Sequence, residues 1–400
     1  MIRVEEALDI LLGDPPHLNT ETVELTDIPG RVCAETVTAQ INQPPFPASA
    51  MDGYAVRSAD ATLNSTLSVI GEAAAGKPFP GHLNMGEAVR VFTGSVVPSG
   101  ADHVIIQEHV HRQRETITVT AQLSPKHNIR AAGIDLQKGD VLASPGLRMH
   151  ELHGSVFAAA NVSRVKVYQK PHIAVFTNGD ELIEPGSSLL PGQIINSNQF
   201  ALKHLVEKWG GDCTYLGRAS DSKESIEHII KSGLNADILV AVGGASVGDY
   251  DYTKDSLTAL GGKIVFSKIA VKPGKPTWYG KLNQTRVLGL PGNPASALVT
   301  AALFLRPLIK SLSGEKQTTN QWRSGRLLSP LPANGERENY LRARIETDPA
   351  GTTSLRPASS QDSSLLKPFL FCDALIRRKP GATALQEGAL VDFMSLKGDF

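Results

Sequence analysis

The sequence predicts a multidomain α/β protein with a central doubly wound parallel sheet, β-rich N-terminal modules and a C-terminal β-barrel-like domain. The chain has 400 residues, which is long enough for about two to four domains. Between residues 172 and 312, short apolar runs alternate with helical stretches, a pattern that indicates a parallel sheet covered by helices on both faces. On either side of this region, short β-rich runs separated by Gly and Pro predict small β modules.

The elements are expected in the following order. Val4, Leu8 and Leu11 have helical spacing, and Gly13 ends this first helix. Four β-rich runs then predict a small β module, at residues 66–70, 88–92, 103–107 and 116–120. In the α/β region we expect strands at 173–176, 213–216, 238–242, 264–266 and 287–290, and helices at 196–209, 223–231, 252–260 and 295–305. Short strands return at 340–344, 374–377 and 389–393.

Composition excludes several classes of function. Lys and Arg together number 40, as do Asp and Glu, and no basic cluster interleaved with aromatic residues is present, so we expect no nucleic-acid partner. The three cysteines lie far apart without CxxC spacing, which argues against a zinc site or a disulfide framework. The N-terminus lacks the apolar core of a signal peptide, and no apolar run approaches the ~20 residues that span a bilayer. We therefore expect a cytoplasmic protein with no membrane partner.

Two segments of the N-terminal half carry candidate chemistry. In the Pro-rich stretch 44–57, the Asp52-Gly53 turn can direct a carboxylate outward, although a simple loop between β modules explains it equally well. Further on, Arg130 can grip a phosphate and Asp135 can hold a metal, against the alternative of a charged surface hairpin.

The α/β region places further candidates where its strands end. Residues 177–181, Asp221 and the glycine-rich stretch 243–251 each follow a predicted strand, and ligands of such sheets bind beyond the carboxyl ends of the strands. Glycine-rich loops leave backbone N–H groups free to hold an anion. Prolines fix the lysines of 268–276 in a way that suggests a rigid anion clamp, and residues 291–294 lead into the next helix.

The ordered set of motifs is far more specific than any one of them. It comprises residues 49–55, 93–94 with 100–102 and 107–108, 128–130 with 133 and 135, 178–181, 243–248 with 251–252, 272–276, and 290–294. In this order the motifs resemble the molybdopterin molybdenumtransferase family, which includes the E domain of gephyrin. The resemblance covers roughly residues 1–350, and the C-terminal module fits it more loosely.

The resemblance implies four modules and a homodimer whose active cleft lies between subunits. The modules are an elongated N-terminal module at 1–43 and 137–171, a β module inserted at 44–136, an α/β molybdopterin-binding domain at 172–312 and a C-terminal β domain at 320–400. The implied reaction inserts molybdate into adenylyl-molybdopterin with Mg²⁺, giving molybdenum cofactor and AMP. The implied upstream partner is molybdopterin adenylyltransferase.

The resemblance also assigns site residues. Catalytic positions are Asp52, Thr93, Asp135, Asp221 and Asp251, of which Asp52, Asp135 and Asp251 are the metal ligands. Substrate-binding positions are Arg130, Glu181, Gly243, Gly244, Ser246, Lys268, Lys272, Lys275, Pro291 and Pro294. These acidic and basic residue types suit the implied reaction. Cleavage of a phosphoanhydride bond requires magnesium held by carboxylates and cations that neutralise the charge developing on phosphate. Accordingly we expect Arg130, Lys272 and Lys275 to bind oxyanions, and Glu181 and Ser246 to bind the pterin.

Two other functions stay open from the sequence. A tungstate-inserting relative fits the same motifs, since tungstate and molybdate have the same charge and nearly the same size. A non-catalytic molybdopterin-binding scaffold also fits, although it has no need of Asp52, Asp135 and Asp251. The family pattern is broken at Pro47-Ala48, at Val97 and at residues 361–364, and the last of these puts the role of the C-terminal module in doubt.

Overall fold

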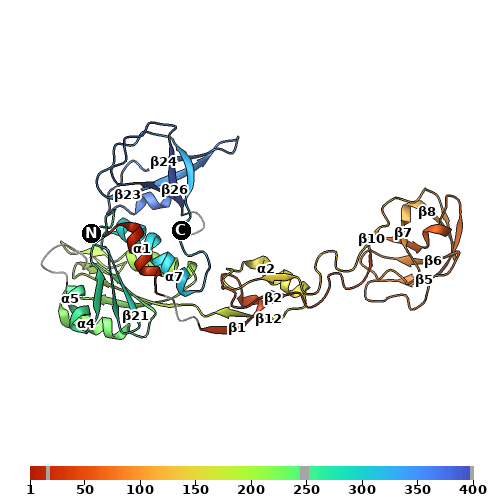
Figure 1. The fold of residues 1–400 in the computed structure, drawn as a ribbon, viewed down its shortest axis with the longest axis horizontal. Helices are drawn as coiled ribbons and strands as arrows, with labels where there is room; N and C mark the ends of the chain where they lie inside the picture. Colours follow the sequence, from red (N-terminus) through yellow and green to blue (C-terminus); the bar gives the residue numbers. More distant parts are fainter. Residues whose placement is uncertain (15–18, 244–251, 397–400) are drawn as a thin grey trace.

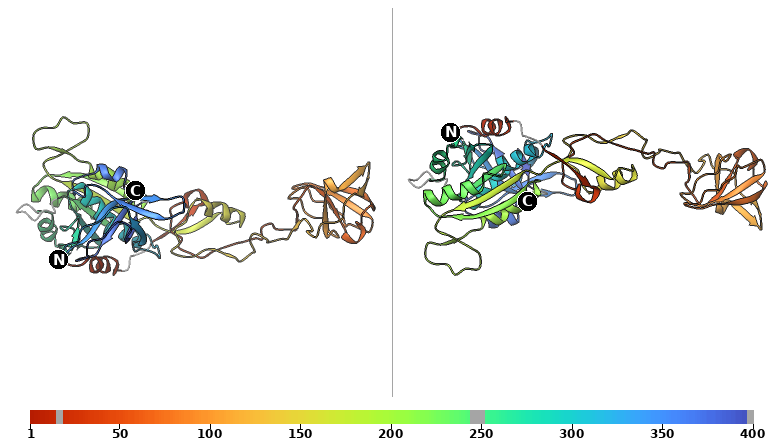
Figure 2. Two further views of the ribbon diagram at one scale, coloured as in Figure 1. Left: turned by 90° about the horizontal axis from the view of Figure 1, so that it is seen from above. Right: turned by 90° about the horizontal axis from the view of Figure 1, so that it is seen from below.

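The chain forms an elongated molecule with the α/β and C-terminal domains at one end and a β module at the other (Figure 1). The computed structural model describes residues 1–14, 19–243 and 252–396. A narrow middle module joins the two ends, and the views from above and below show the same extended arrangement (Figure 2). We call the α/β domain and the C-terminal barrel the body, and the small module at 44–136 the distal module.

The α/β domain is built on a six-stranded sheet in the order β16-β13-β17-β21-β20-β18. The strands are β13 (His172–Asn178), β16 (Asp212–Ala219), β17 (Ile238–Val242), β18 (Lys263–Phe266), β20 (Trp278–Leu282) and β21 (Thr285–Leu290). The first four strands in that order are parallel, as predicted, whereas β20 pairs antiparallel with β21 and β18. Sequence analysis missed β20. In the structure a tight turn joins this strand to β21, and Asn283 in the turn has a φ of 53°.

Helices cover both faces of this sheet, which confirms the doubly wound prediction. They are α3 (Asn198–Lys208), α4 (Lys223–Ser232), α5 (Tyr252–Ala259), α6 (Pro294–Thr300) and α7 (Arg306–Leu312), with a π-helical segment at Ala301–Leu305 between the last two. Alternate residues of the strands explain the two layers. Val175 and Val240 share a core with α3, α6 and α7, whereas Ala174 and Leu239 share one with α4 and α5.

Helix α1 (Val4–Leu12) packs on the α/β domain rather than in the N-terminal module, in which we had placed residues 1–43. Val4, Ala7 and Leu11 form its buried face and join the core around α7. The helical spacing was predicted correctly, but spacing alone does not reveal which domain buries a helix.

The continuous helical segment Pro294–Leu312 is long and apolar enough to cross a membrane by length and composition. Its most apolar window is 89% buried inside the protein, however. It packs between the central sheet and α1, which is the position of a core helix.

The middle module consists of short paired strands and one helix. Strand β1 (Thr20–Glu24) pairs with β12 (Arg164–Tyr168), and β2 (Val37–Thr38) pairs with β11 (Val141–Ala143). Helix α2 (Glu151–Ala159) covers them through Phe157, and a short 3₁₀ turn at Leu25–Asp27 lies beside it. The chain passes through this module twice, on its way to the distal module and on its way back.

The distal module is a six-stranded sheet in the order β7-β4-β6-β5-β9-β8. Its strands are β4 (Gly53–Val56), β5 (Thr66–Ala73), β6 (Glu87–Val91), β7 (His103–Ile106), β8 (Val110–Gln113) and β9 (Thr116–Val119). A further pair, β3 (Ala48–Ser49) with β10 (Ile129–Arg130), lies where the chain enters and leaves. Short 3₁₀ turns follow β4 at Ser58–Asp60 and β7 at Gln107–His109.

The C-terminal domain is a closed barrel, which confirms the predicted β-barrel-like domain. Its strands are β22 (Arg323–Leu327), β23 (Glu338–Thr347), β24 (Thr353–Pro357), β25 (Ala374–Arg378) and β26 (Leu390–Ser395), and a 3₁₀ turn at Lys367–Leu370 lies between β24 and β25 in the chain. The ring closes because β25 pairs with both β26 and β23. Strand β19 (Val271–Lys272) of the α/β domain extends this barrel by pairing in parallel with β23, so the two domains are joined at Lys272.

Candidate active site

A cavity of about 730 Å³ lies at the carboxyl ends of β13, β17 and β21. We call it the strand-end cavity. Its lining includes Thr177, Asn178, Glu181, Asn196, Asn198, Gly243, Lys275, Pro291 and Pro294. The location follows from the topology, since loops at this edge of a parallel sheet gather around one crevice. Short strands β14 (Leu182–Ile183) and β15 (Ile194–Ile195) border it.

A buried hydrogen-bond network fixes the floor of the strand-end cavity. Asn196 Nδ2 donates to Thr177 Oγ1 at 3.0 Å and to the Tyr215 hydroxyl at 2.8 Å. Asn178 Nδ2 donates to Asp221 Oδ1 at 3.2 Å, so Asp221 braces the end of β13. The side-chain oxygens of Asn178 and Asn198 are buried and accept no hydrogen bond within the part of the chain that the structure describes. Two buried acceptors beside the strand-end cavity therefore lack a donor within the described chain.

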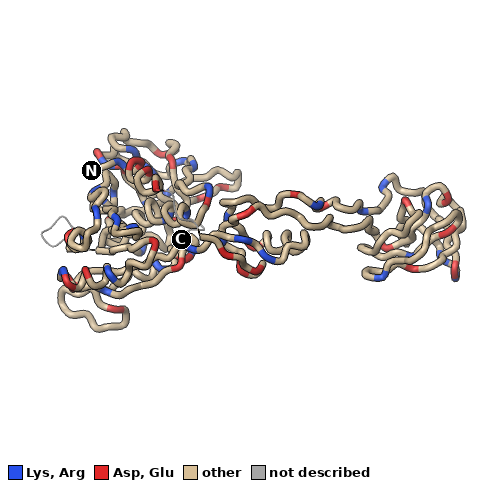
Figure 3. The backbone as a smooth tube through the Cα atoms, turned by 60° about the horizontal axis from the view of Figure 1, so that its bottom comes forward, with Lys and Arg blue, Asp and Glu red and all other residues tan. Residues whose placement is uncertain are grey.

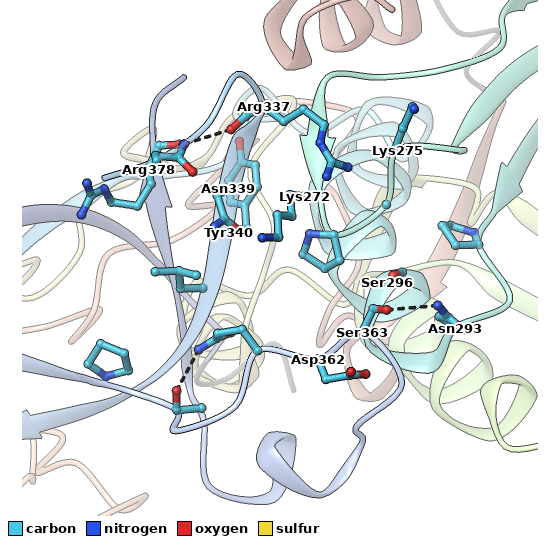
Figure 4. Close-up of a pocket in the computed structure, with 18 of the residues that line it drawn as sticks. Lys272, Lys275, Asn293, Ser296, Arg337, Asn339, Tyr340, Asp362, Ser363 and Arg378 are labelled. Carbon is cyan, nitrogen blue, oxygen red and sulfur yellow. Dashed lines mark hydrogen bonds between the residues drawn. The ribbon is translucent and has the colours of Figure 1, made fainter. Parts of the chain in front are cut away.

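A second cavity, also of about 730 Å³, lies between the α/β domain and the barrel (Figure 4). We call it the interdomain cleft. Its polar lining includes Lys272, Lys275, Asn293, Ser296, Arg337, Asn339, Asp362, Ser363 and Arg378. It shares Lys275, Pro276, Pro291 and Asn293 with the strand-end cavity, so the two spaces adjoin.

The cleft is strongly cationic. Four basic side chains line it, Lys272, Lys275, Arg337 and Arg378, against the single carboxylate of Asp362. Neither lysine forms an ion pair with any described residue. Elsewhere charges of both signs are spread along the whole molecule (Figure 3). The local excess of positive charge therefore favours an anionic ligand in this cleft.

Arg342 holds the barrel loop that closes the cleft. This arginine is 1% exposed, and its guanidinium donates to the carbonyls of Leu365 at 2.7 Å and Asp362 at 2.8 Å. Burial lowers the pKa of Arg342 from its ordinary value. Ser363 of the same loop accepts a hydrogen bond from Asn293 Nδ2 at 3.0 Å, which ties the barrel to the start of α6 (Figure 4).

Asp52 lies in the distal module, where Thr93 holds its carboxylate. Asp52 Oδ1 accepts hydrogen bonds from the backbone N–H of Thr93 at 2.7 Å and from its hydroxyl at 2.8 Å. These bonds, chiefly the one from the backbone, lower the pKa of Asp52, with a smaller contribution from the charge of Arg90. Asp52 Oδ2 accepts no hydrogen bond from any described residue, so it is open to a ligand.

The predicted site residues fall into two groups within one chain. Asp52, Thr93, Arg130 and Asp135 belong to the distal module and its junction, at the far end of the molecule from both cavities (Figure 1). Glu181, Gly243, Lys272, Lys275, Pro291 and Pro294 line the cavities of the body. Lys268 is exposed and lines neither cavity. Gly244, Ser246 and Asp251 lie outside the described residues.

Family models match most of the chain. Residues 2–161 match the MoeA N-terminal region (domain I and II), residues 174–311 match a model described as "Probable molybdopterin binding domain", and residues 324–396 match the MoeA C-terminal region (domain IV). A molybdopterin molybdenumtransferase of Haemophilus influenzae is 40% identical over 320 residues, which cover 79% of this chain and 79% of the relative. The chain belongs to the molybdopterin molybdenumtransferase family.

Further comparisons agree with this assignment. The enzyme of the same name from a Nostoc species is 35% identical over 355 residues, covering 85% of this chain and 81% of the relative. The crystal structure of a molybdopterin biosynthesis MoeA protein from Pyrococcus horikoshii superposes with a TM-score of 0.84 at 31% identity, covering 99% of both chains. The predicted membership of this enzyme family and the predicted multidomain fold are thus confirmed, and the scaffold and tungstate alternatives are not favoured.

Sequence analysis missed the barrel's share of the site. Residues 361–364 depart from the family pattern, which had left the role of the C-terminal module in doubt. In the structure Gln361, Asp362 and Ser363 line the interdomain cleft together with Arg337 and Asn339. The signal that was available is a cationic residue just before β23, Arg337, and an amide at its start, Asn339, but only the pairing of β19 with β23 brings them beside Lys272.

Proposed function

We propose that this protein inserts molybdate into adenylyl-molybdopterin in the presence of Mg²⁺, releasing AMP and forming molybdenum cofactor. The observation that carries the proposal is the pair of adjoining cavities that share Lys275 and Asn293. One has amide acceptors suited to a pterin, and the other has cations suited to an oxyanion. Insertion of molybdate into a pterin dithiolene requires these two ligands side by side.

In this proposal the strand-end cavity holds the pterin. A pterin ring presents an amino group and a ring N–H as donors, and the proposed acceptors are the oxygens of Asn178 and Asn198, which accept no hydrogen bond from any described residue. Glu181, which is exposed at the same edge, offers a third acceptor. An unpaired buried acceptor costs about 1–3 kcal/mol, so a donor-bearing ligand is favoured over an apolar one.

The interdomain cleft then receives molybdate, a tetrahedral dianion. Lys272, Lys275 and Arg337 supply positive charge, and Ser363 supplies a hydroxyl. Their role is to hold the oxyanion against the dithiolene end of the bound pterin and to exclude water as a competing nucleophile.

Asp52 is the residue of this chain best suited to Mg²⁺. No group of three or more His, Cys, Asp or Glu side chains is gathered in the described part of the chain. Magnesium fits nonetheless, because it is usually held by one or two carboxylates together with substrate phosphates rather than by a protein cage. Asp52, ionised and with Oδ2 open, meets this requirement, and Asp135 and Asp251 are the further ligands we propose. When bound, the ion neutralises charge that develops on the phosphate.

A homodimer is part of the proposal, since one chain keeps Asp52 far from the cavities (Figure 1). A second copy with its distal module placed over the body of the first brings the two groups of residues together. We further propose that the protein is cytoplasmic, binds neither nucleic acid nor membrane, and receives its substrate from molybdopterin adenylyltransferase.

The experiment that tests the function is cofactor formation in vitro. The full-length protein is incubated with adenylyl-molybdopterin, Mg²⁺ and micromolar molybdate, and AMP release and active cofactor are measured. We expect both products with the wild type and neither with Asp52→Ala. Binding of the adenylylated pterin without AMP release at any molybdate concentration contradicts the proposal. AMP release with tungstate but not with molybdate shows that tungstate is the oxyanion inserted.

A further inference from the structure

Arg90 lies beside Asp52 in the distal module without forming an ion pair with it. Arg90 is on β6 directly opposite Tyr54 of β4. Its guanidinium carbon is 5.0 Å from the ring centre of Tyr54 and 4.9 Å from that of Phe92. Two aromatic rings thus hold the guanidinium in place by cation–π attraction and prevent it from swinging into solvent.

The same guanidinium links the residue after Asp52 to Gln107, which itself bonds the carbonyl of Asp52. Arg90 Nη1 donates to the carbonyl of Gly53, the next residue, at 3.3 Å. Arg90 Nη2 donates to Gln107 Oε1 at 2.8 Å, and the backbone N–H of Gln107 donates in turn to the carbonyl of Asp52 at 3.0 Å. The ends of β4 and β7 are therefore tied together around this one aspartate.

Neighbouring residues leave the Asp52 backbone little freedom to relax. A Cβ atom on Gly53 would lie 1.9 Å from the carbonyl oxygen of Ile105, so the start of β4 is pressed directly against β7. Thr93, which holds Oδ1 of Asp52, comes three residues after Arg90, just beyond the end of β6. With Oδ1 occupied and the backbone clamped, Oδ2 is the oxygen left free to face a ligand.

We propose that Arg90 is a positioning residue for Asp52: it holds the carbonyl of Gly53 directly and that of Asp52 through Gln107, so that the free carboxylate oxygen points outward in a fixed direction. The inference rests on the proposed role of Asp52 in the reaction. The clamp acts on the turnover step, because misplacement of a reacting group by about 1 Å costs on the order of 100-fold in rate. The two hydrogen bonds that Arg90 donates both go to protein atoms of its own module, the Gly53 carbonyl and Gln107 Oε1.

The test is a double-substitution cycle measured by AMP release from the full-length protein. We expect Arg90→Met to lower kcat by about 30- to 100-fold, with KM for molybdate changed less than about twofold. Arg90→Lys, which keeps the charge but cannot bridge both acceptors, should fall between Arg90→Met and the wild type. In an Asp52→Asn background, Arg90→Met should have no further effect, because both substitutions act through the same carboxylate.

A matched control separates positioning from general stability. Arg57→Met removes another arginine of the same module, one whose partner is Asp60 at 3.5 Å, and should leave kcat within twofold. Gln107→Leu alters an exposed side chain and breaks the same clamp, so it should lower kcat several-fold even if Arg90→Met fails to fold.

Two results overturn the inference while leaving the proposed function intact. One is an Arg90→Met enzyme with near wild-type kcat. The other is an Arg90→Met effect that persists at full size in the Asp52→Asn background, which indicates a purely structural role. A wild type that releases no AMP overturns the proposed function, and the inference falls with it.

Discussion

In the distal module neighbouring residues hold the carboxylate of Asp52, whereas the interdomain cleft presents two lysines, Lys272 and Lys275, that form no ion pair with any described residue. Asp52 is fixed by hydrogen bonds from Thr93 and by the backbone ties of Arg90. Lys272 and Lys275 are fixed by the chain itself, through the Pro-Gly turn between them and the pairing of β19 with the barrel. The difference teaches that the acidic and basic halves of the proposed site are built separately, on modules that one chain holds apart.

The largest expected effect comes from inactivating the acidic part and the basic part of the proposed site by substitutions in separate chains. Asp52→Asn should lower kcat by about 100- to 1,000-fold, because it removes the negative charge that we propose holds Mg²⁺ at the reacting phosphate. Lys275→Met should also inactivate, since Lys275 lines both cavities. If the site is shared between subunits, mixing and reassociating the two inactive variants should restore about a quarter of wild-type AMP release, because half of the dimers then carry one intact site of two. No recovery in a mixed dimer contradicts the shared site.

Removing one cation of the cleft should have the next largest effect. Lys272→Met is expected to raise KM for molybdate by about 10- to 100-fold, the usual range for a lost charge-assisted hydrogen bond, with affinity for the adenylylated pterin nearly unchanged. Lys263→Met, at an exposed position on β18 of the same domain, serves as the control and should change neither constant. Equal effects of the two substitutions on KM would show that overall charge, not the cleft, attracts molybdate.

Loosening the barrel loop should reduce both stability and activity. Arg342→Met leaves the carbonyls of Asp362 and Leu365 without their donor. We expect the free energy of unfolding to fall by about 2–3 kcal/mol and KM for molybdate to rise several-fold, because Ser363 and Asp362 are no longer held at the cleft. Calorimetry and steady-state kinetics measure the two changes. A stable variant with normal KM would show that the loop does not depend on Arg342.

The smallest expected effect concerns pH. The hydrogen bonds from Thr93 lower the pKa of Asp52, so the carboxylate remains ionised to lower pH than an ordinary aspartate, and its contribution is lost as pH falls through that lowered pKa. Thr93→Val removes the hydroxyl donor and keeps the backbone donor. Activity at neutral pH should fall by no more than about threefold, while the acid limb of the kcat profile moves to higher pH. An unmoved or downward-shifted limb contradicts this assignment.

Local patterns in the sequence were sufficient for most of the strands and helices of the α/β sheet, but not for those of the middle module. The alternation of strands and helices after residue 172 and the helical spacing of Val4, Leu8 and Leu11 depend on neighbours in sequence, and both were predicted. The candidate residues at the ends of β13 and β17 also follow from the chain order, because the carboxyl ends of parallel strands lie at one edge.

Contacts between distant segments were decided only by the tertiary structure. The burial of α1 against α7, the addition of β19 to the barrel and the loop held by Arg342 join residues hundreds or tens of positions apart, and no local period encodes such a pairing. The sequence by itself determined the family, the α/β core and the identity of the charged residues. The tertiary structure decided which of them share a cavity, because that depends on how the modules pack and on the length of the middle module that keeps Asp52 away from Lys275.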